Sequence, residues 1–200
     1  MPELEKVKCD WFSQGGIMEK YHDEEWGIPE HDDIRLFEFL MLEAMQCGLS
    51  WAIVMKKREA FRACFDNWDF NKIALYDENK LNKIIAYPNM LKSMPKIKAM
   101  VTNAKAYIKI RQEFGSFDSY LWKFTDGKTL IYKDNQEKMP AKNELSELIA
   151  KDLKKRGFKY LGPVTVYSYL QACGVINDHQ DKCFLYRYIC ENFECSVVSD

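Results

Sequence analysis

The sequence is organised around residues 32–65, DDIRLFEFLMLEAMQCGLSWAIVMKKREAFRACF, which its pattern divides into two helices at Gly48. In the first helix, residues 32–47, apolar side chains occupy nearly every side. We therefore expect this helix to be buried, with Glu43 inside it. Glycine suits the end of a helix, and Ser50 is a typical residue to cap the start of the next one. This stretch predicts a buried carboxylate close to a tight turn.

The expected burial of Glu43 leaves two interpretations open. A buried carboxylate costs several kcal/mol unless it is paired or hydrogen-bonded, and a cationic ligand would offset this cost. Aromatic rings could stack on a flat ligand of that kind. Alternatively, Glu43 bonds to neighbouring backbone and the tryptophans fill the core, which is the favoured interpretation for each tryptophan taken singly. The aromatic candidates are Trp11, Tyr21, Trp26 and Trp51.

Helical periodicity and capping residues recur through most of the remaining chain. Strand signals are nearly absent apart from a short stretch at 129–132, so we predict an all-α fold. Residues 1–31 show little periodicity, and we expect a mostly irregular segment there. Further helices are expected at 69–76, 77–87, 93–114, 116–124, 143–156 and 163–173.

The composition is that of a globular protein. The chain has 200 residues, of which 47% are hydrophobic and 30% charged, which is enough for one domain or for a main lobe with a smaller one. The net charge is −1, so any nucleic-acid site must come from a local basic patch. No apolar run resembles a secretory signal or a membrane span, and we expect a cytoplasmic protein that does not interact with membranes.

Cysteine and histidine residues near both ends of the chain can form a metal site. The seven cysteines are odd in number and the chain is not small, which argues against a disulfide framework. Two cysteines and two histidines would make a closed tetrahedral zinc site. On spacing alone, separate buried cysteines and unrelated histidines are the favoured interpretation. The four candidate ligands are Cys9, His22, His179 and Cys183.

Residues 153–165 predict two helices joined by a glycine-bounded basic turn. Free amides at the start of the second helix can bind a backbone phosphate without reading sequence. Lys154, Lys155, Arg156 and Lys159 supply local positive charge. The alternative is an ordinary helix–turn–helix connection with a solvated basic face.

Taken together, these stretches resemble the bacterial DNA-3-methyladenine glycosylase I family. The similarity extends from residue 9 to residue 183, and its combination of motifs is highly specific. The stretches include Cys9-Asp-Trp11, Tyr21-His-Asp-Glu-Glu-Trp26-Gly, Leu42-Glu43, Gly48-Leu-Ser-Trp51, Lys155-Arg-Gly-Phe-Lys-Tyr-Leu-Gly-Pro163, Gln171-Ala-Cys-Gly174 and Asn177-Asp-His179.

The resemblance implies a helix-hairpin-helix DNA glycosylase fold in a single domain, residues 1–185. It also implies that Cys9, His22, His179 and Cys183 bind one structural Zn²⁺, which joins the N-terminal segment 1–31 to the C-terminal segment 175–185. The family pattern gives no role for the tail, residues 186–200.

The resemblance also implies roles for individual residues. Glu43 would recognise and act on the base. Tyr21 and Trp51 would share its pocket, with Trp11, Trp26 and Met18 beside it. Leu49 would enter the DNA stack as the damaged nucleotide leaves. DNA binding is expected at Gly48, Leu49, Ser50, Lys159, Gly162 and Thr165.

The implied reaction is hydrolysis of the N-glycosidic bond of 3-methyladenine in alkylated double-stranded DNA. Its products are the free base and an abasic site, without a lyase step, and we expect a monomer. Asp178 lies near the position where many related enzymes use an aspartate, but the adjacent His179 favours a structural role. Met18 stands where relatives carry a tyrosine, so the alternative is a non-catalytic module that binds damaged bases or DNA.

Overall fold

The computed structural model describes residues 6–11, 15–136 and 139–198. The chain divides into two compact units. We call the first the terminal unit, because it contains Met1–Glu30, Trp122–Ala141 and Leu170–Asp200. The second, the helical unit, contains His31–Leu121 and Lys142–Tyr169. Both ends of the chain therefore belong to one unit.

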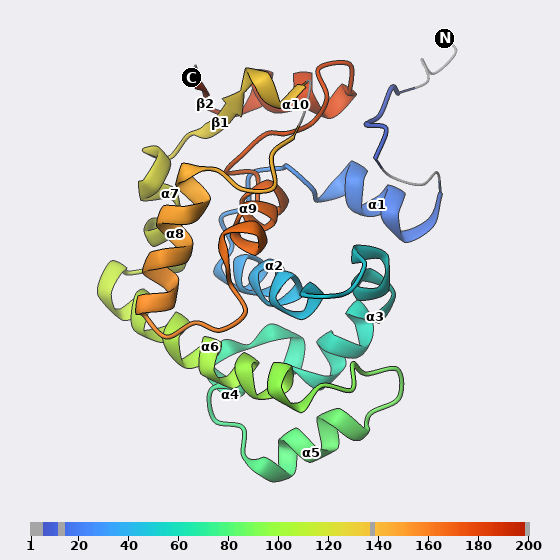
Figure 1. The fold of residues 1–200 in the computed structure, drawn as a ribbon, viewed down its shortest axis with the longest axis vertical. Helices are drawn as coiled ribbons and strands as arrows, with labels where there is room; N and C mark the ends of the chain where they lie inside the picture. The colour runs from blue at the N-terminus through green and yellow to red at the C-terminus, as the bar shows by residue number, and fades with distance from the viewer. Residues whose placement is uncertain (1–5, 12–14, 137–138, 199–200) are drawn as a thin grey trace. The chain divides into compact units, whose positions relative to one another are not determined.

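The helical unit is built from the helices that the periodicity predicts (Figure 1). Carboxylates and an amide cap several of them: Asp32 accepts from two amides of α2, and Asn143 forms a capping box with Ser146. The elements are α2 (Asp33–Gln46), α3 (Trp51–Cys64), a 3-10 helix η1 (Asp66–Trp68), α4 (Phe70–Ile73), α5 (Glu78–Ala86), α6 (Met94–Phe114), α7 (Phe117–Trp122), α8 (Glu144–Lys155) and α9 (Pro163–Ala172), of which Trp122 and residues 170–172 belong to the terminal unit.

Helix α2 lies at the centre of the helical unit, as its apolar composition predicts. Every residue from Leu36 to Met45 is buried. Phe37 packs edge-on against Trp68 and Tyr107, with ring centroids 6.3 and 4.8 Å away. The Tyr107 hydroxyl donates to the carbonyl oxygen of Asp33, which ties α6 to the first turn of α2. A helix enclosed on all sides places even its polar side chains in the interior.

The terminal unit contains elements that the sequence pattern does not indicate. Residues 1–31 include helix α1 (Gly16–Glu24), and the tail forms α10 (Phe184–Asn192) and β2 (Cys195–Val198). Two 3-10 helices, η2 (Lys123–Thr125) and η3 (Lys133–Gln136), flank β1 (Thr129–Tyr132). Strand β1 confirms the strand expected at 129–132.

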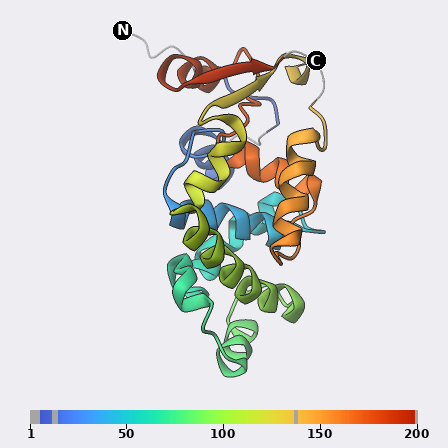
Figure 2. The same ribbon diagram turned by 90° about the vertical axis from the view of Figure 1, so that its left-hand side faces the viewer.

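The two strands correct the all-α prediction to a mostly helical fold with a small sheet. β1 pairs in parallel with β2, with Thr129 opposite Cys195 (Figure 2). A four-residue strand has little stability without a partner, and its partner here lies 66 residues later in the sequence. None of the helices in the described ranges combines the length and the apolarity that a membrane crossing requires.

Candidate functional site

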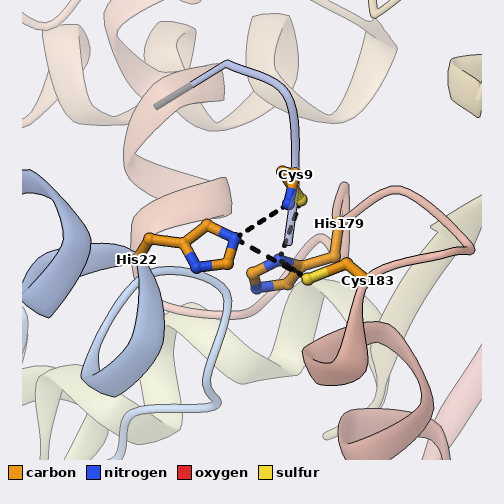
Figure 3. Close-up of side chains that lie close together, drawn as sticks. All are labelled: Cys9, His22, His179 and Cys183. Atoms are coloured by element: carbon orange, nitrogen blue, oxygen red, sulfur yellow. Dashed lines mark hydrogen bonds between the residues drawn. The ribbon is translucent and has the colours of Figure 1, made fainter. Parts of the chain in front are cut away.

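The four predicted metal ligands come together in the terminal unit (Figure 3). All four are buried, and their donor atoms lie within 4.8 Å of one another. Nδ1 of His179 lies 3.4 Å from Sγ of Cys9 and 3.6 Å from Sγ of Cys183, and Nε2 of His22 lies 3.7 Å from Sγ of Cys183. Two thiols and two imidazoles that face one centre can hold a metal ion in a tetrahedral arrangement.

The four ligands come from the ends of two helices and from two irregular segments. His22 is in the last turn of α1, and Cys183 is the residue before the first turn of α10. Cys9 and His179 are in irregular segments. Gly27 has a φ of +79°, and a Cβ atom there would lie 2.6 Å from Nε2 of His179. The cluster therefore requires glycine at this position.

The outer nitrogen of each histidine is hydrogen-bonded, as expected for metal ligands. Nδ1 of His22 donates to Oδ1 of Asp23 at 2.7 Å, and Nε2 of His179 donates to the carbonyl oxygen of Trp26 at 2.9 Å. These bonds fix the tautomers so that the other nitrogen of each ring presents its lone pair to the centre. Asp23 lies within the matched stretch Tyr21-His-Asp-Glu-Glu-Trp26-Gly, but neither the resemblance nor the spacing assigned it a role.

Hydrogen bonds join the two thiols to each other and join Cys183 to the two histidines. The bond with Cys9 lowers the pKa of Cys183, and His179 and His22 lower it further. The same bond, together with burial, raises the pKa of Cys9. Burial by itself would lower the pKa of His22, but hydrogen bonds with Cys183 and Asp23 outweigh it and raise that pKa. One sulfur thus takes thiolate character readily, which is the form that binds metal.

Two of the predicted base-binding tryptophans pack against this cluster. The ring of Trp26 meets His179 edge-on with centroids 4.5 Å apart, and Trp11 meets Trp26 at 4.8 Å. Trp26 is buried, whereas Trp11 is 41% exposed. Tyr21 is buried and Met18 is half-buried, both on α1. These four residues belong to the terminal unit.

Asp178 has a structural environment in the same unit. Its side chain is buried, and its two oxygens accept hydrogen bonds from the amides of Asn135 at 2.6 Å and Gln171 at 2.8 Å. Two amides of the surrounding protein thus hold the carboxylate. This supports the structural role expected from its neighbour His179.

The carboxylate of Glu43 is buried in the helical unit without a partner of its own. Only 4% of the residue is exposed, and within the described part of the chain no hydrogen bond or ion pair reaches its carboxylate. Burial raises the pKa of Glu43 to about 8. A carboxyl group in this state is mostly protonated at neutral pH, and a cationic partner beside it would favour its ionised form.

The turn between α2 and α3 presents Leu49 three residues after the end of α2. Gly48 has a φ of +79°, and the amide of Leu49 donates to the carbonyl oxygen of Gln46. The side-chain amide of Gln46 donates to the carbonyl oxygen of Leu49 at 2.8 Å. Leu49 is half-buried, Ser50 is exposed, and Trp51 is the half-buried first residue of α3. Two hydrogen bonds between Gln46 and Leu49 therefore hold the turn.

Ser50 does not cap α3 with its side chain, contrary to expectation. It occupies the position before the helix, but its hydroxyl makes no capping bond. Its carbonyl oxygen instead accepts from the amides of Ile53 and Val54. The exposed hydroxyl remains available to other partners.

Lys96, for which the sequence predicted no role at this turn, supports the same turn. Its ammonium group donates to the carbonyl oxygens of Met45 at 2.8 Å and Cys47 at 2.5 Å. A positive charge on the last carbonyls of α2 is favourable because these groups carry the negative end of the helix dipole. Burial lowers the pKa of Lys96. The only sequence signal was a lysine next to Pro95 at the start of a helix.

The basic turn between α8 and α9 lies beside the end of α2. The thiol of Cys47 lies 3.5 Å from the carbonyl oxygen of Tyr160 and 3.6 Å from Oγ1 of Thr165. Gly157 has a φ of +97°, as the end of a helix requires. Lys159 and Gly162 are exposed, and Thr165 is half-buried in the first turn of α9. The predicted DNA-binding positions of the two turns thus lie within one unit.

Comparison with known proteins identifies the family. The model of the methyladenine glycosylase family matches residues 11–186. The chain belongs to this family. DNA-3-methyladenine glycosylase 1 of Escherichia coli (strain K12) is 38% identical over 180 residues, which cover 90% of this chain and 96% of that protein.

Solved structures of methyladenine glycosylases are similar to most of this chain. A crystal structure of 3-methyladenine DNA glycosylase I matches with a TM-score of 0.84 at 42% identity, covering 89% of this chain and 98% of that one. A tyrosine-to-phenylalanine variant of 3-methyladenine DNA glycosylase I in complex with 3-methyladenine matches with a TM-score of 0.84 at 34% identity, covering 88% and 96%. These structures establish the mostly helical glycosylase architecture of this chain.

Proposed function

We propose that this chain removes 3-methyladenine from alkylated double-stranded DNA by hydrolysing the N-glycosidic bond. The observation that carries this proposal is the unpartnered buried carboxylate of Glu43 in a member of the methyladenine glycosylase family. Methylation at N3 gives adenine a positive charge and weakens its bond to the sugar. The enzyme therefore needs to extrude the nucleotide and hold the cation rather than protonate the leaving group.

Glu43 supplies the negative charge for this step. Its carboxylate accepts a hydrogen bond from the amino edge of the extruded base, and the cationic ring offsets the cost of the buried charge. Water then attacks the sugar as neutral 3-methyladenine departs. Trp51 belongs to the same proposed base site, and the base-binding roles of Tyr21, Trp11, Trp26 and Met18 remain predictions.

The two turns of the helical unit provide the DNA contacts in this proposal. Leu49 fills the space in the stack that the extruded nucleotide leaves, supported by the turn through Gly48 and Ser50. We propose that α8, α9 and the basic turn form a helix-hairpin-helix element. Its amides at Gly162 and Thr165, with Lys159, bind backbone phosphate at the start of α9.

We further propose that the Cys/His cluster holds one structural Zn²⁺. Cys9, His22, His179 and Cys183 fit this ion by donor type, by mutual distance and by the hydrogen bonds on their outer nitrogens. Bound zinc would cross-link the two ends of the terminal unit. Four protein ligands leave no open position for a water molecule, so the ion would stabilise the fold and take no part in hydrolysis.

The glycosylase assay tests the reaction. Purified protein incubated with methylated duplex DNA is expected to release free 3-methyladenine, measured by chromatography, and to leave abasic sites without strand cleavage. Binding of the damaged duplex with no release would indicate the non-catalytic module instead. A protein that binds neither the damaged duplex nor the free base would reject both the glycosylase and the non-catalytic module.

Metal analysis tests the zinc site separately. We expect one zinc per chain in the wild-type protein, and loss of zinc with a lower melting temperature in Cys9→Ser. Cys64→Ser is the matched control, because Cys64 is also a buried thiol but is not in the cluster. Wild-type protein that purifies without zinc and does not gain stability on its addition would refute the assignment.

A further inference from the structure

A groove in the helical unit lies between α6 and the turn that joins α8 to α9. It has a volume of about 390 Å³ and is lined by Pro95, Lys98, Ala99, Thr102, Lys159 and Tyr160. One wall is the first half of α6, and the other is the basic turn. Each wall contributes a lysine, so the groove favours an anionic occupant.

Hydrogen bonds inside the unit hold the two walls in place. The buried side chain of Asn103 accepts from the amide of Lys159 at 2.8 Å and donates to the carbonyl oxygen of the same residue at 3.1 Å. Lys96, about two turns earlier on α6, binds the end of α2. The first half of α6 is thus fixed to both turns that the proposed function assigns to DNA. A duplex held by both turns would lie close to this part of α6.

The basic character continues along α6 beyond the groove. Residues 98, 102, 105 and 109 recur at helical spacing, so they share one face. All four are exposed, and in the described part of the chain no ion pair involves Lys105 or Lys109. Over the whole of α6 the single acidic residue is Glu113, near its end. This lysine face contrasts with the net charge of −1 of the whole chain.

The spacing of the lysine face suits a nucleic-acid backbone. From Lys98 to Lys109 the helix rises about 16 Å, at about 1.5 Å per residue. One DNA strand presents a phosphate about every 3.4 Å along the axis, so about five phosphates fall within this length. Lysines without direct base contacts bind such a backbone through charge and regardless of sequence.

We propose that the lysine face of α6, formed by Lys98, Thr102, Lys105 and Lys109, is a second phosphate-binding surface for duplex DNA. It binds backbone that flanks the lesion, and the groove beside Lys159 joins it to the basic turn. This inference rests on the proposed function and extends it, because it adds a surface that contacts neither the damaged base nor the turn at Leu49.

The ion pair between Lys98 and Glu78 sets the strength of this surface. Nζ of Lys98 lies 2.8 Å from Oε1 of Glu78, and both side chains are more than half exposed. A phosphate must compete with this carboxylate for Lys98. Glu78→Gln removes this carboxylate, which both competes for Lys98 and repels phosphate, so the variant is expected to bind the duplex more tightly.

Salt-dependent binding of an undamaged fluorescent duplex tests the proposal. Lys105→Gln combined with Lys109→Gln should reduce the slope of log K against log salt by about 1.8, because each phosphate contact contributes about 0.9. The control pair is Lys72→Gln with Lys83→Gln, exposed lysines on α4 and α5 outside this face. Thermal melting checks that both pairs are folded.

The outcomes separate this proposal from the proposed function. A reduced slope in the lysine-face variant, no change in the control, and tighter binding by Glu78→Gln would support the surface. An unchanged slope in a protein that releases 3-methyladenine would overturn the surface and leave the function intact. A wild-type protein that releases no base would reject the function, while the slope measurement would still decide whether α6 binds duplex DNA.

Discussion

Two glutamates on α2 are equally buried, but their surroundings are opposite. Glu38 is 3% exposed and Glu43 is 4% exposed. Glu38 accepts hydrogen bonds from three arginines: Arg35 at 3.0 Å, Arg58 at 2.9 Å and Arg62 at 2.8 Å. Burial would raise the pKa of Glu38, but the bonds from Arg58 and Arg62 outweigh it and lower that pKa. For Glu43, burial acts alone and raises the pKa to about 8.

The difference teaches how a structural carboxylate can be told from a functional one. The arginines around Glu38 satisfy both of its oxygens, so the group links α2 to α3 and has no capacity left for a ligand. Glu43 costs stability when it is ionised, and no arginine or lysine of the unit offsets that cost. This contrast supports the proposal that a ligand provides the missing partner of Glu43.

The largest expected effect is on stability when Glu38 is changed. Glu38→Gln leaves the buried guanidinium of Arg58 without its counter-charge, which should cost about 3–5 kcal/mol in the free energy of unfolding. Denaturant unfolding measures this cost. Glu59→Gln is the matched control: Glu59 pairs with the same Arg62 but is 81% exposed, so its loss should cost less than about 1 kcal/mol. Equal effects of the two variants would contradict the structural role of Glu38.

The second prediction concerns opposite pH dependences. The folded-state pKa of Glu43 lies above its unfolded value, so wild-type stability falls as pH rises from about 4.3 towards 8. Glu43→Gln should therefore gain stability relative to wild type across this window, by a few kcal/mol at pH 8, since each pKa unit corresponds to about 1.4 kcal/mol. If the two proteins keep a constant difference from pH 5 to 9, Glu43 does not titrate as described.

Glu38 should show the reverse behaviour in the same experiment. Its folded-state pKa is lowered, so its contribution is present above the unfolded pKa and disappears as pH falls through the folded one. Relative to wild type, Glu38→Gln should lose stability as pH rises through the acid range, whereas Glu43→Gln should gain stability as pH rises towards 8. Relative stabilities that change in the same direction with pH for both variants would end the contrast between the two glutamates.

The third and smallest effect is on ligand binding. Glu43→Gln should weaken binding of free 3-methyladenine about 10–100-fold, the value of a hydrogen bond to a charged group of about 1.5–3 kcal/mol. Calorimetry at pH 8.5 measures this loss. Glu59→Gln is again the control and should bind normally. Full affinity in Glu43→Gln would show that the carboxylate does not contact the base.

The sequence predicts the helices of this fold because their apolar period and their caps are local signals. Helix α2 could be predicted to be buried from its composition, and with it the burial of Glu43. The helix α1 and the tail could not be predicted. Gly15 and Gly16 lie at the start of α1, where two glycines give no sequence signal for a helix. Strand β2 forms by pairing with β1, which is distant in the sequence.

The metal cluster shows the limit of reasoning from spacing. Cys9 and His179 lie 170 positions apart in irregular segments, so residue type made them candidate ligands but spacing favoured separate roles, and the family resemblance was needed to group them. Asp23, Lys96 and the arginines around Glu38 were missed, because ionic and hydrogen-bond partners depend on how helices pack. The sequence does not predict which carbonyl or carboxylate a given lysine or arginine will bind.

A ¹³C NMR titration of the carboxyl group of Glu43 tests the central claim most directly. Glu43→Gln assigns the signal by its loss. In the free protein we predict a midpoint near 8, and addition of 3-methyladenine should lower it, because a base that donates hydrogen bonds favours the ionised form. A midpoint between 4 and 5 that does not respond to the base would contradict the assignment of Glu43 as the carboxylate that receives the ligand.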